Sequence, residues 1–357
     1  MDEKAMLGEL RDRVIAAHQQ REPLRLRGAG TKDFYGEEIT AATVLDLRPC
    51  RGIVDYEPSE LVITARCGTP LSEIEATLHD RGQFLAFEPP AFGGDPTIGG
   101  VVAAGLSGPR RMYAGAARDF VLGATLLDAR GNLLRFGGQV MKNVAGFDVS
   151  RLLCGSLGIL GIITEVSLKV LPRPRAEETL RFEMSARDAI AAFNRWSGQP
   201  LPLSGASWWD GLAWIRLSGA GSAVRAAYEQ LGGERVDPTT ATQWWETLRH
   251  CQHPIFTSDT LWRLSVPDTT PPLALPGNQL IDWGGALRWY ASDTQSGDDA
   301  RKVASSAEGT AMCWRGAAPQ GGRFHPLQPT VATLTRRLKD RFDPHGIFNP
   351  GRMIAGL

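Results

Sequence analysis

The chain has 357 residues, more than one hydrophobic core usually organises, so two domains are expected. Its 39 basic and 39 acidic residues leave no net charge, which disfavours a nucleic-acid partner. No apolar run approaches the roughly 20 residues needed to cross a bilayer, and the N-terminus MDEKAMLGELRDRV is too charged for a signal peptide. The sequence therefore predicts a cytoplasmic protein, which a partner could still hold at a membrane.

The cysteines argue against a metal or cluster site. The chain has five, odd in number, widely separated and without a C-x-x-C pair: Cys50, Cys67, Cys154, Cys251 and Cys313. That spacing disfavours a zinc site, an iron–sulfur cluster and a disulfide framework. We therefore expect free thiols and no bound metal.

The N-terminal half is predicted to begin with a surface helix that leads into short strands. Leu7, Leu10, Val14 and Ala17 recur at three- and four-residue spacing, which predicts a helix over residues 2–20. Short β-branched runs separated by glycine, proline and polar turns then predict four strands: LRLRG, TVLDLR, GIVDYE and ELVITARCG.

A second helix is predicted over residues 70–81. Thr69 is expected as its N-cap, Pro70 occupies the first helical position, and an apolar stripe runs from Leu71 to Leu78. Further along, FVLGATLLDARGNLLRF predicts a β-hairpin. VSRLLCGSLG then predicts a short helix ended by glycine, and ILGIITEVSLKVL a buried strand.

The chain changes character at LPRPR, Leu171 to Arg175, where two prolines interrupt regular structure. We expect a boundary there, between a first domain of residues 1–175 and an α+β cap domain of residues 176–320. In the cap, runs such as LAWIRLS, TLWRLSV and GALRWYA alternate with predicted helices at about residues 186–196, 221–231, 240–250 and 297–307.

The last 37 residues, 321–357, are expected to form a C-terminal segment that packs on the first domain. An amphipathic helix is predicted at about residues 329–342. It leads into the turn-rich tail FDPHGIFNPGR, which we expect to return to the first domain.

The segment LRGAGTK, Leu26 to Lys32, places two glycines directly after a predicted strand, flanked by Arg27 and Lys32. Backbone N–H groups freed by glycine, with two cations nearby, can bind a diphosphate. The segment is not a Rossmann fingerprint, because Asp33 stands where the third glycine would be, and it is not a Walker A loop. Taken alone, an ordinary tight turn remains the commoner explanation.

Two further glycine-rich stretches follow. PPAFGGDPTIGGVVAAGLSGPRR, Pro89 to Arg111, is small and apolar, so its backbone is expected to face a neighbouring element or a flat ligand. The second stretch, Met141 to Val170, contains Lys142 and Asn143, then another turn of small residues and a predicted buried strand. By itself this pattern indicates only a closely packed turn.

Together, TIGG, SGPRR, RDFVLG, KNVAGFD, GSLGILGIIT and FNPGR, in that order, resemble the vanillyl-alcohol oxidase superfamily, also called the p-cresol methylhydroxylase type. The resemblance extends from Arg27 to Arg352. It implies an α+β fold with a two-subdomain FAD-binding domain, an α+β cap and a C-terminal segment that returns to the FAD-binding domain. It also implies an oxidoreductase subunit acting on a small 2-hydroxy acid, with a second flavin subunit and an iron–sulfur subunit as partners.

The resemblance implies FAD contacts from three parts of the chain. The first loop would bind the pyrophosphate, the TIGG segment would line the central part of the flavin, and the segment at Ile162 would reach the adenine side. The implied cofactor-binding residues are Arg27, Gly28, Ala29, Gly30, Thr31, Lys32, Pro89, Thr97, Gly99, Gly100, Gly158 and Ile162.

Two departures from the resemblance bear on the cofactor. Many relatives carry a histidine in the first loop that bonds covalently to the flavin, and this chain has Thr31 and Lys32 there. Non-covalent FAD is therefore implied. Many relatives also have asparagine where this chain has Gly105, which puts a contact from that position in doubt.

The sequence does not identify catalytic residues. Oxidation of a 2-hydroxy acid needs a base for the hydroxyl proton, a cation for the carboxylate and a flavin to accept the hydride. Related catalytic subunits have a histidine-rich cap, whereas this cap offers His250, His253 and His325, for which structural or exposed roles are favoured. His345 in the tail is the remaining candidate.

Two functional alternatives stay open. A self-sufficient FAD-dependent D-2-hydroxy-acid dehydrogenase, for example for lactate, would need no partner. A flavin-binding structural subunit would bind FAD without chemistry of its own. Arg110 and Arg111 could bind flavin phosphate or substrate carboxylate, or lie solvated at a helix end.

All ten tryptophans lie at or beyond Trp196, in the second half of the chain. Two pairs are adjacent in sequence, Trp208–Trp209 and Trp244–Trp245. Tryptophan supplies large apolar area with few rotatable bonds, so we expect the tryptophans to contribute to a partner interface, with core packing as the alternative.

Overall fold

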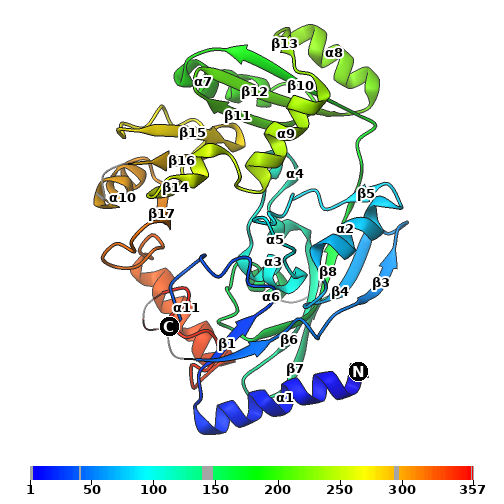
Figure 1. Cartoon of the computed structure of the whole chain (residues 1–357), viewed down its shortest axis with the longest axis vertical. Helices are drawn as coiled ribbons and strands as arrows, with labels where there is room; N and C mark the ends of the chain where they lie inside the picture. Colours follow the sequence, from blue (N-terminus) through cyan, green and yellow to red (C-terminus); the bar gives the residue numbers. More distant parts are fainter. Residues whose placement is uncertain (1–2, 40–41, 139–147, 293–296, 355, 357) are drawn as a thin grey trace.

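The computed structural model describes residues 3–39, 42–138, 148–292, 297–354 and 356. Figure 1 shows the N-terminal half at the bottom of the view and the second half at the top. Helix α11 (Pro329–Phe342) lies back beside the N-terminal half, against which Leu338 and Phe342 pack. Among the described residues, no helix is long and apolar enough to span a membrane.

The N-terminal half contains two small strand pairs and one larger antiparallel sheet. Helix α1 (Glu3–Gln20) precedes the parallel pair β1 (Leu24–Arg27) and β2 (Thr43–Asp46). The larger sheet has the order β3 (Ile53–Glu57), β4 (Val62–Arg66), β8 (Ile162–Lys169), β6 (Val121–Leu127) and β7 (Leu133–Gly137). The second pair is β5 (Gln83–Phe84) and β9 (Leu171–Pro172).

Five short helices follow α1 in the described part of this half: α2 (Leu71–His79), α3 (Ile98–Ala104), α4 (Arg111–Ala114), α5 (Ala117–Phe120) and α6 (Val149–Leu153). All but α4 contribute buried side chains to the apolar cluster on the larger sheet. Ile74 and Leu78 of α2 and Ile98 of α3 are fully buried, and each such side chain contributes about 1.5–3 kcal/mol. The predicted first helix, four strands, hairpin, short helix and buried strand of this half are confirmed.

The predicted N-cap of the second helix is wrong by one residue. Pro70 occupies the N-cap position of α2 and makes no side-chain bond there. The Thr69 hydroxyl instead accepts a hydrogen bond from Gly52 N (2.9 Å) and lies 3.1 Å from Gly52 O, to which it donates. Thr69 therefore ties the start of α2 to the residue before β3, and this backbone bond competes with capping.

The second half forms the cap, an eight-stranded antiparallel sheet covered by helices. Its order is β13 (Glu234–Arg235), β10 (Ala176–Glu183), β12 (Leu212–Gly219), β11 (Leu203–Trp209), β15 (Asn278–Asp282), β16 (Leu287–Ala291), β14 (Leu261–Ser265) and β17 (Thr310–Arg315). The helices are α7 (Ala186–Ser197), α8 (Gly221–Leu231), α9 (Pro238–Arg249), α10 (Gly297–Ser306) and the 3₁₀ turns η1 (Pro254–Thr257) and η2 (Trp283–Gly285).

The four helices predicted in the cap, and the strands predicted at LAWIRLS, TLWRLSV and GALRWYA, are confirmed as α7 to α10 and as β12, β14 and β16. Within the described ranges, the cap strands pair only with one another. That pairing supports the proposed boundary near residue 175, where β9 ends and β10 begins.

The expectation that the tryptophans form a partner interface is wrong for most of them. Seven of the ten are buried inside the chain: Trp196, Trp214, Trp245, Trp262, Trp283, Trp289 and Trp314. Trp214 stacks on Trp244 with ring centroids 4.4 Å apart, and Trp245 Nε1 donates to Thr179 Oγ1 at 3.0 Å. Aromatic side chains therefore fill the space between the cap sheet and α9.

The C-terminal tail returns to the N-terminal half, as predicted. Leu24 N donates to Ile347 O at 2.7 Å, and Phe348 forms a β-bridge with Leu24. Upstream, the buried ammonium of Lys339 lies 2.6 Å from the Asp343 carboxylate and donates to Phe348 O at 2.8 Å. The tail is thus fixed beside β1, directly next to the first glycine loop.

A buried ion-pair network joins the two halves. Glu88, which follows β5, is 8% exposed, and its Oε1 lies 3.2 Å from Arg110 Nε and 2.9 Å from Arg216 Nη2 on β12. Arg110 also pairs with Glu177 of β10 at 2.8 Å. Arg110 is therefore occupied by two carboxylates rather than by solvent.

Candidate functional site

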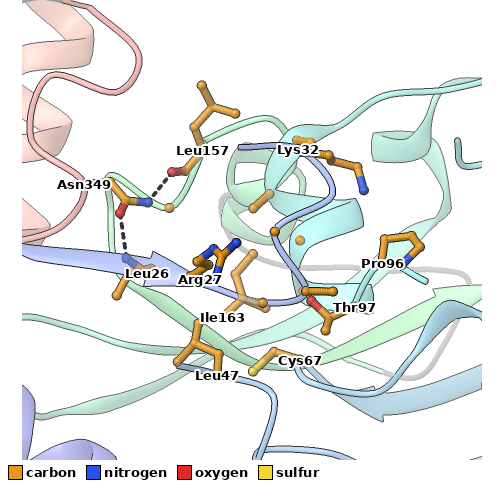
Figure 2. Close-up of a pocket in the computed structure, with 18 of the residues that line it drawn as sticks. Leu26, Arg27, Lys32, Leu47, Cys67, Pro96, Thr97, Leu157, Ile163 and Asn349 are labelled. Carbon is orange, nitrogen blue, oxygen red and sulfur yellow. Dashed lines mark hydrogen bonds between the residues drawn. The ribbon is translucent and has the colours of Figure 1, made fainter. Parts of the chain in front are cut away.

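An open cavity of about 830 Å³ lies where the first loop, α3, the turn before β8 and the C-terminal tail meet (Figure 2). The lining residues are Leu26, Arg27, Gly28, Ala29, Gly30, Thr31, Lys32, Asp33, Tyr35, Leu47, Cys67, Pro96, Thr97, Gly99, Gly100, Ala103, Ala104, Leu157, Gly158, Gly161, Ile162, Ile163, Asn349 and Arg352.

The structure brings together the cofactor-binding residues implied by the sequence, with one exception. The first loop, Thr97, Gly99, Gly100, Gly158 and Ile162 all line this one cavity, although they come from three separate segments. Pro89 lies outside the lining, and its carbonyl accepts a hydrogen bond from Arg249 Nε at 3.3 Å. Lys142 and Asn143 lie outside the described residues.

The first loop lines the cavity, and its backbone donors have no protein acceptor among the described residues. Within the described chain, the N–H groups of residues 28–32 donate to no protein acceptor. The loop is held in shape by Asp33 N donating to Gly30 O at 3.1 Å, with Gly30 at φ +77°. A Cβ on Gly28 would lie 2.2 Å from Thr97 Oγ1, so the loop packs directly on the start of α3. Consecutive free N–H groups of this kind form a concave anion site.

The two cations of the loop differ in their partners. Arg27 lies 2.9 Å from Asp33 Oδ2, and that carboxylate balances its charge. No carboxylate among the described residues lies within ion-pair distance of Lys32, whose ammonium is 5.5 Å from the centre of the Phe92 ring. Burial lowers the pKa of Lys32 to about 8. Lys32 therefore supplies a positive charge that a bound anion would compensate.

The tail clamps this loop through Asn349. Figure 2 shows its side chain between two segments: Oδ1 accepts from Leu26 N at 2.8 Å, and Nδ2 donates to Leu157 O at 2.7 Å. A Cβ on Gly158 would lie 2.7 Å from Asn349 Nδ2, so glycine is needed there. Asn349 itself has φ +41°, a region that asparagine tolerates better than most residues.

Arg352 holds the other end of the loop. Its guanidinium donates to three backbone carbonyls, Lys32 O (3.0 Å), Asp33 O (2.8 Å) and Glu37 O (2.8 Å). Neither Asn349 nor Arg352 was predicted from the sequence as a site residue. The signal was present in FNPGR, but it was used only to support the resemblance.

Helix α3 presents bare backbone to the cavity at Gly100. A Cβ on Gly99 would lie 2.6 Å from Cys67 Cβ, so Gly99 is needed for packing on the neighbouring strand end. A Cβ on Gly100 would meet only Thr97 Oγ1, at 3.3 Å. A flat ring could therefore approach the backbone of α3 closely at Gly100.

Gly105 ends α3 in the left-handed region, with φ +64°. A Cβ there would lie 2.9 Å from Gly155 Cα, so the position packs against backbone. A side chain at this position would have to displace that contact.

The catalytic candidate His345 lies outside the cavity lining. It is exposed, and its ring stacks on His18 of α1 with centroids 4.2 Å apart. Its Nδ1 lies 3.0 Å from His18 O. This position supports a role in attaching the tail to α1.

The cap histidines have structural partners. His250 Nδ1 accepts from Ala91 N at 3.1 Å, and His325 Nδ1 accepts from Ala311 N at 3.3 Å. His253 packs edge-on against Trp209 and Trp244, and burial lowers its pKa to about 4. In the part of the chain that is described, no three side chains of histidine, cysteine, aspartate or glutamate are grouped as metal ligands.

Comparisons with known proteins agree with this geometry. Residues 6–137 match the FAD binding domain family. The chain is 50% identical over 349 residues to glycolate oxidase subunit GlcE of Escherichia coli (strain K12), covering 98% of this chain and 97% of that protein. It is 32% identical over 174 residues to glycolate oxidase subunit GlcD of Bacillus subtilis (strain 168), covering 48% and 37%. A solved structure of alkyldihydroxyacetonephosphate synthase superposes with a TM-score of 0.68, over 96% of this chain and 74% of that one. At 17% sequence identity, this match shows similarity of fold alone.

The cavity fits FAD. Free N–H groups and an unpaired lysine match a diphosphate, and the bare backbone at Gly100 matches a flat ring system. FAD is the cofactor of the matched domain family. Because half of the aligned residues are identical along nearly the whole length of both proteins, the chain belongs to the GlcE family of glycolate oxidase subunits.

Proposed function

We propose that the chain is the FAD-binding subunit of a glycolate oxidase complex, which oxidises glycolate to glyoxylate and passes electrons to an iron–sulfur partner subunit. The whole-length identity to GlcE is the observation that carries this proposal. A second flavin subunit of the GlcD kind is the other proposed partner. We place the complex in the cytoplasm, with any membrane attachment made through partner subunits.

In this proposal each segment that lines the cavity contacts a different part of FAD. The N–H groups of residues 28–32 and the Lys32 ammonium bind the pyrophosphate, and Asn349 and Arg352 hold that loop in place. Gly100 and Thr97 support the central part of the flavin, and Ile162 lies on the adenine side. Bound FAD would supply the hydride acceptor for oxidation of a 2-hydroxy acid.

FAD is expected to be released completely from this chain by acid or heat. The first loop has Thr31 and Lys32 where relatives attach flavin to histidine, and neither side chain would form such a bond. Flavin absorbance of the supernatant and of the washed precipitate measures the distribution. Yellow colour remaining with the denatured polypeptide would contradict non-covalent binding.

FAD affinity is expected to fall as the pH rises through about 8. Burial lowers the pKa of Lys32 in the free chain to about 8, and a bound diphosphate favours the charged form, which raises that pKa in the complex. Between the pKa of Lys32 in the free chain and its higher pKa in the FAD complex, the affinity for FAD should fall about tenfold per pH unit. Titrations followed by flavin fluorescence, from about pH 6.5 to about pH 9, measure this slope.

Lys32→Met is the matched control for the pH effect. It should bind FAD more weakly than the native chain at neutral pH, and its affinity should not change over this pH range, since the titrating group is gone. An unchanged slope in Lys32→Met would assign the pH dependence to another group.

The complex assay separates the proposed function from its alternatives. The chain is co-expressed with its GlcD-like flavin subunit and an iron–sulfur subunit, purified by a tag on this chain, and assayed for glycolate-dependent dye reduction. Co-purification with turnover, together with little turnover by the isolated chain, supports the proposal. Full turnover by the isolated chain would favour a self-sufficient dehydrogenase, and turnover that survives Gly100→Leu in the complex would favour a structural subunit.

A further inference from the structure

Helix α11 is apolar on one side along its whole length, but only its C-terminal part is covered. Leu338 and Phe342 pack on the core of the N-terminal half. On the preceding turns, Val331 is 46% exposed and Leu334 is 53% exposed, and Leu327, directly before the helix, is 39% exposed. Leu334 is the most exposed large apolar side chain in the described part of the chain.

Helical spacing places these exposed side chains together. Leu327, Val331 and Leu334 are separated by four and three residues, the spacing of one helix face, and they form the apolar row of α11. Leu338 follows four residues later and is packed on the N-terminal half. The row is therefore an outward extension of the core contact, and clustered exposed apolar residues of this kind mark interaction surfaces.

The base of α11 is fixed by a buried lysine. The Lys339 ammonium lies 2.6 Å from Asp343 Oδ2 and donates to Ile159 O at 2.7 Å and to Phe348 O at 2.8 Å. The helix is thus held to the N-terminal half from its C-terminal part. A partner that binds the apolar row would meet an ordered helix and would lose little conformational entropy in ordering it.

Two arginines border the apolar row. Arg337 and Arg341 are exposed and lie three residues after Leu334 and Leu338, so helical spacing places them beside the row. Among the described residues, neither guanidinium has a carboxylate within ion-pair distance. Arg336 is also exposed, but it is two residues from Leu334 and faces another side of α11. The row therefore carries positive charge along one edge.

We propose that α11 binds a partner subunit of the glycolate oxidase complex by placing its apolar row in an apolar groove of that subunit. Carboxylates at the border of the groove pair with Arg337 and Arg341, which gives the contact its electrostatic complementarity. A helix that binds a groove through residues at three- and four-residue spacing is a common mode of protein recognition. The existence of the partner rests on the proposed function.

A membrane surface matches α11 less well than a protein groove does. Helices that lie in a membrane interface bury a broad apolar face that includes aromatic residues, opposite a strongly basic face. The exposed row of α11 is narrow and aliphatic, and the one aromatic residue of the helix, Phe342, packs on the N-terminal half. Asp340, which is exposed, adds a negative charge to the polar side. These features favour a protein as the occupant.

The test is co-expression of the tagged chain with its GlcD-like and iron–sulfur subunits, followed by pull-down and measurement of the partner-to-chain ratio over a dilution series. Leu334→Asp should weaken association by about thirtyfold or more, because it places a charge at the centre of an apolar contact. Arg337→Glu should weaken association as well, because it sets like charges against each other. Amide exchange of residues 327–337 should be slower in the native complex than in the isolated chain.

Two control variants change the same kinds of side chain elsewhere. Leu133→Asp replaces a leucine of β7 that is 49% exposed, and Arg336→Glu reverses the charge of an exposed arginine on another side of α11. Both should keep the native partner-to-chain ratio. All four variants should keep the native FAD content and circular dichroism spectrum, because each changes an exposed residue outside the cofactor cavity lining.

The outcomes distinguish this inference from the proposed function. A native chain that captures neither subunit would contradict the proposed complex and the docking surface together. Native ratios in both Leu334→Asp and Arg337→Glu would overturn the docking surface and leave the complex in place. Capture of both subunits by Leu334→Asp, with loss of native self-association in sedimentation or of binding to phosphatidylglycerol vesicles, would assign the row to a second copy or to a membrane and overturn the inference.

Discussion

Gly100→Leu is expected to abolish FAD retention while the chain stays folded. Gly100 lies on α3 at the cavity wall, and a Cβ there would meet only Thr97 Oγ1, at 3.3 Å. The remainder of a leucine side chain would therefore extend into ligand volume rather than into the core. The FAD-to-protein ratio, measured by absorbance, should fall from stoichiometric to undetectable, with an unchanged circular dichroism spectrum.

Two other glycines provide matched controls for this prediction. A Cβ on Gly8 of α1 would have no atom within 4 Å, so Gly8→Leu should keep both fold and FAD. At Gly99 a Cβ would lie 2.6 Å from Cys67 Cβ, so Gly99→Ala should lower stability by about 1–3 kcal/mol. Normal FAD content in Gly100→Leu would remove Gly100 from the site.

Glu88→Gln is expected to lower the free energy of unfolding by about 3–5 kcal/mol. Glu88 is buried between Arg110 and Arg216, at 3.2 Å and 2.9 Å, and the substitution keeps its size while removing its charge. The buried guanidinium groups of Arg110 and Arg216, at the junction between the halves, would then lose a negative charge that balances them. Urea denaturation followed by tryptophan fluorescence measures the loss, since the cap contains the buried tryptophans.

The control for Glu88→Gln is an exposed ion pair of the same kind. Glu234 pairs with Arg181 at 2.7 Å, but its side chain is 61% exposed, so Glu234→Gln should cost about 1 kcal/mol or less. Equal stability of the two variants would show that the Glu88 network contributes no more than a surface pair.

Elements whose residues lie close together in the chain could be predicted from the sequence. In α1 the stripe of Leu10, Val14 and Ala17 is buried, as its spacing predicts. The β6–β7 hairpin depends on its turn, where Asp128 Oδ1 accepts from Arg130 N and Asn132 N at 2.9 Å and 2.8 Å. Both signals are local, and both predictions hold.

Features that depend on distant partners were missed. Strand β10, AEETLRFE, is rich in charged residues and forms because it pairs with β12, some 35 residues away. Burial of the tryptophans depends on which strand faces which helix, and this arrangement does not follow from the amino-acid composition. The contact between Leu26 and Asn349 spans 323 residues, so the FNPGR segment alone could not show which loop Asn349 binds. The stacking of Arg111 and Arg263 on the Trp283 ring could likewise be seen only in three dimensions.

The clamp formed by the C-terminal tail determines when the cofactor site can mature during protein synthesis. Residues 26–33 leave the ribosome early, but the side chains that fix them, Asn349 and Arg352, emerge more than 300 residues later. At roughly 5–20 residues per second, that interval lasts tens of seconds. Throughout it the nascent N-terminal half has the donors for FAD without the contacts that hold them in position. We therefore expect flavin capture to follow translation of the tail, and a ribosome stalled before residue 349 to carry a chain that does not retain FAD.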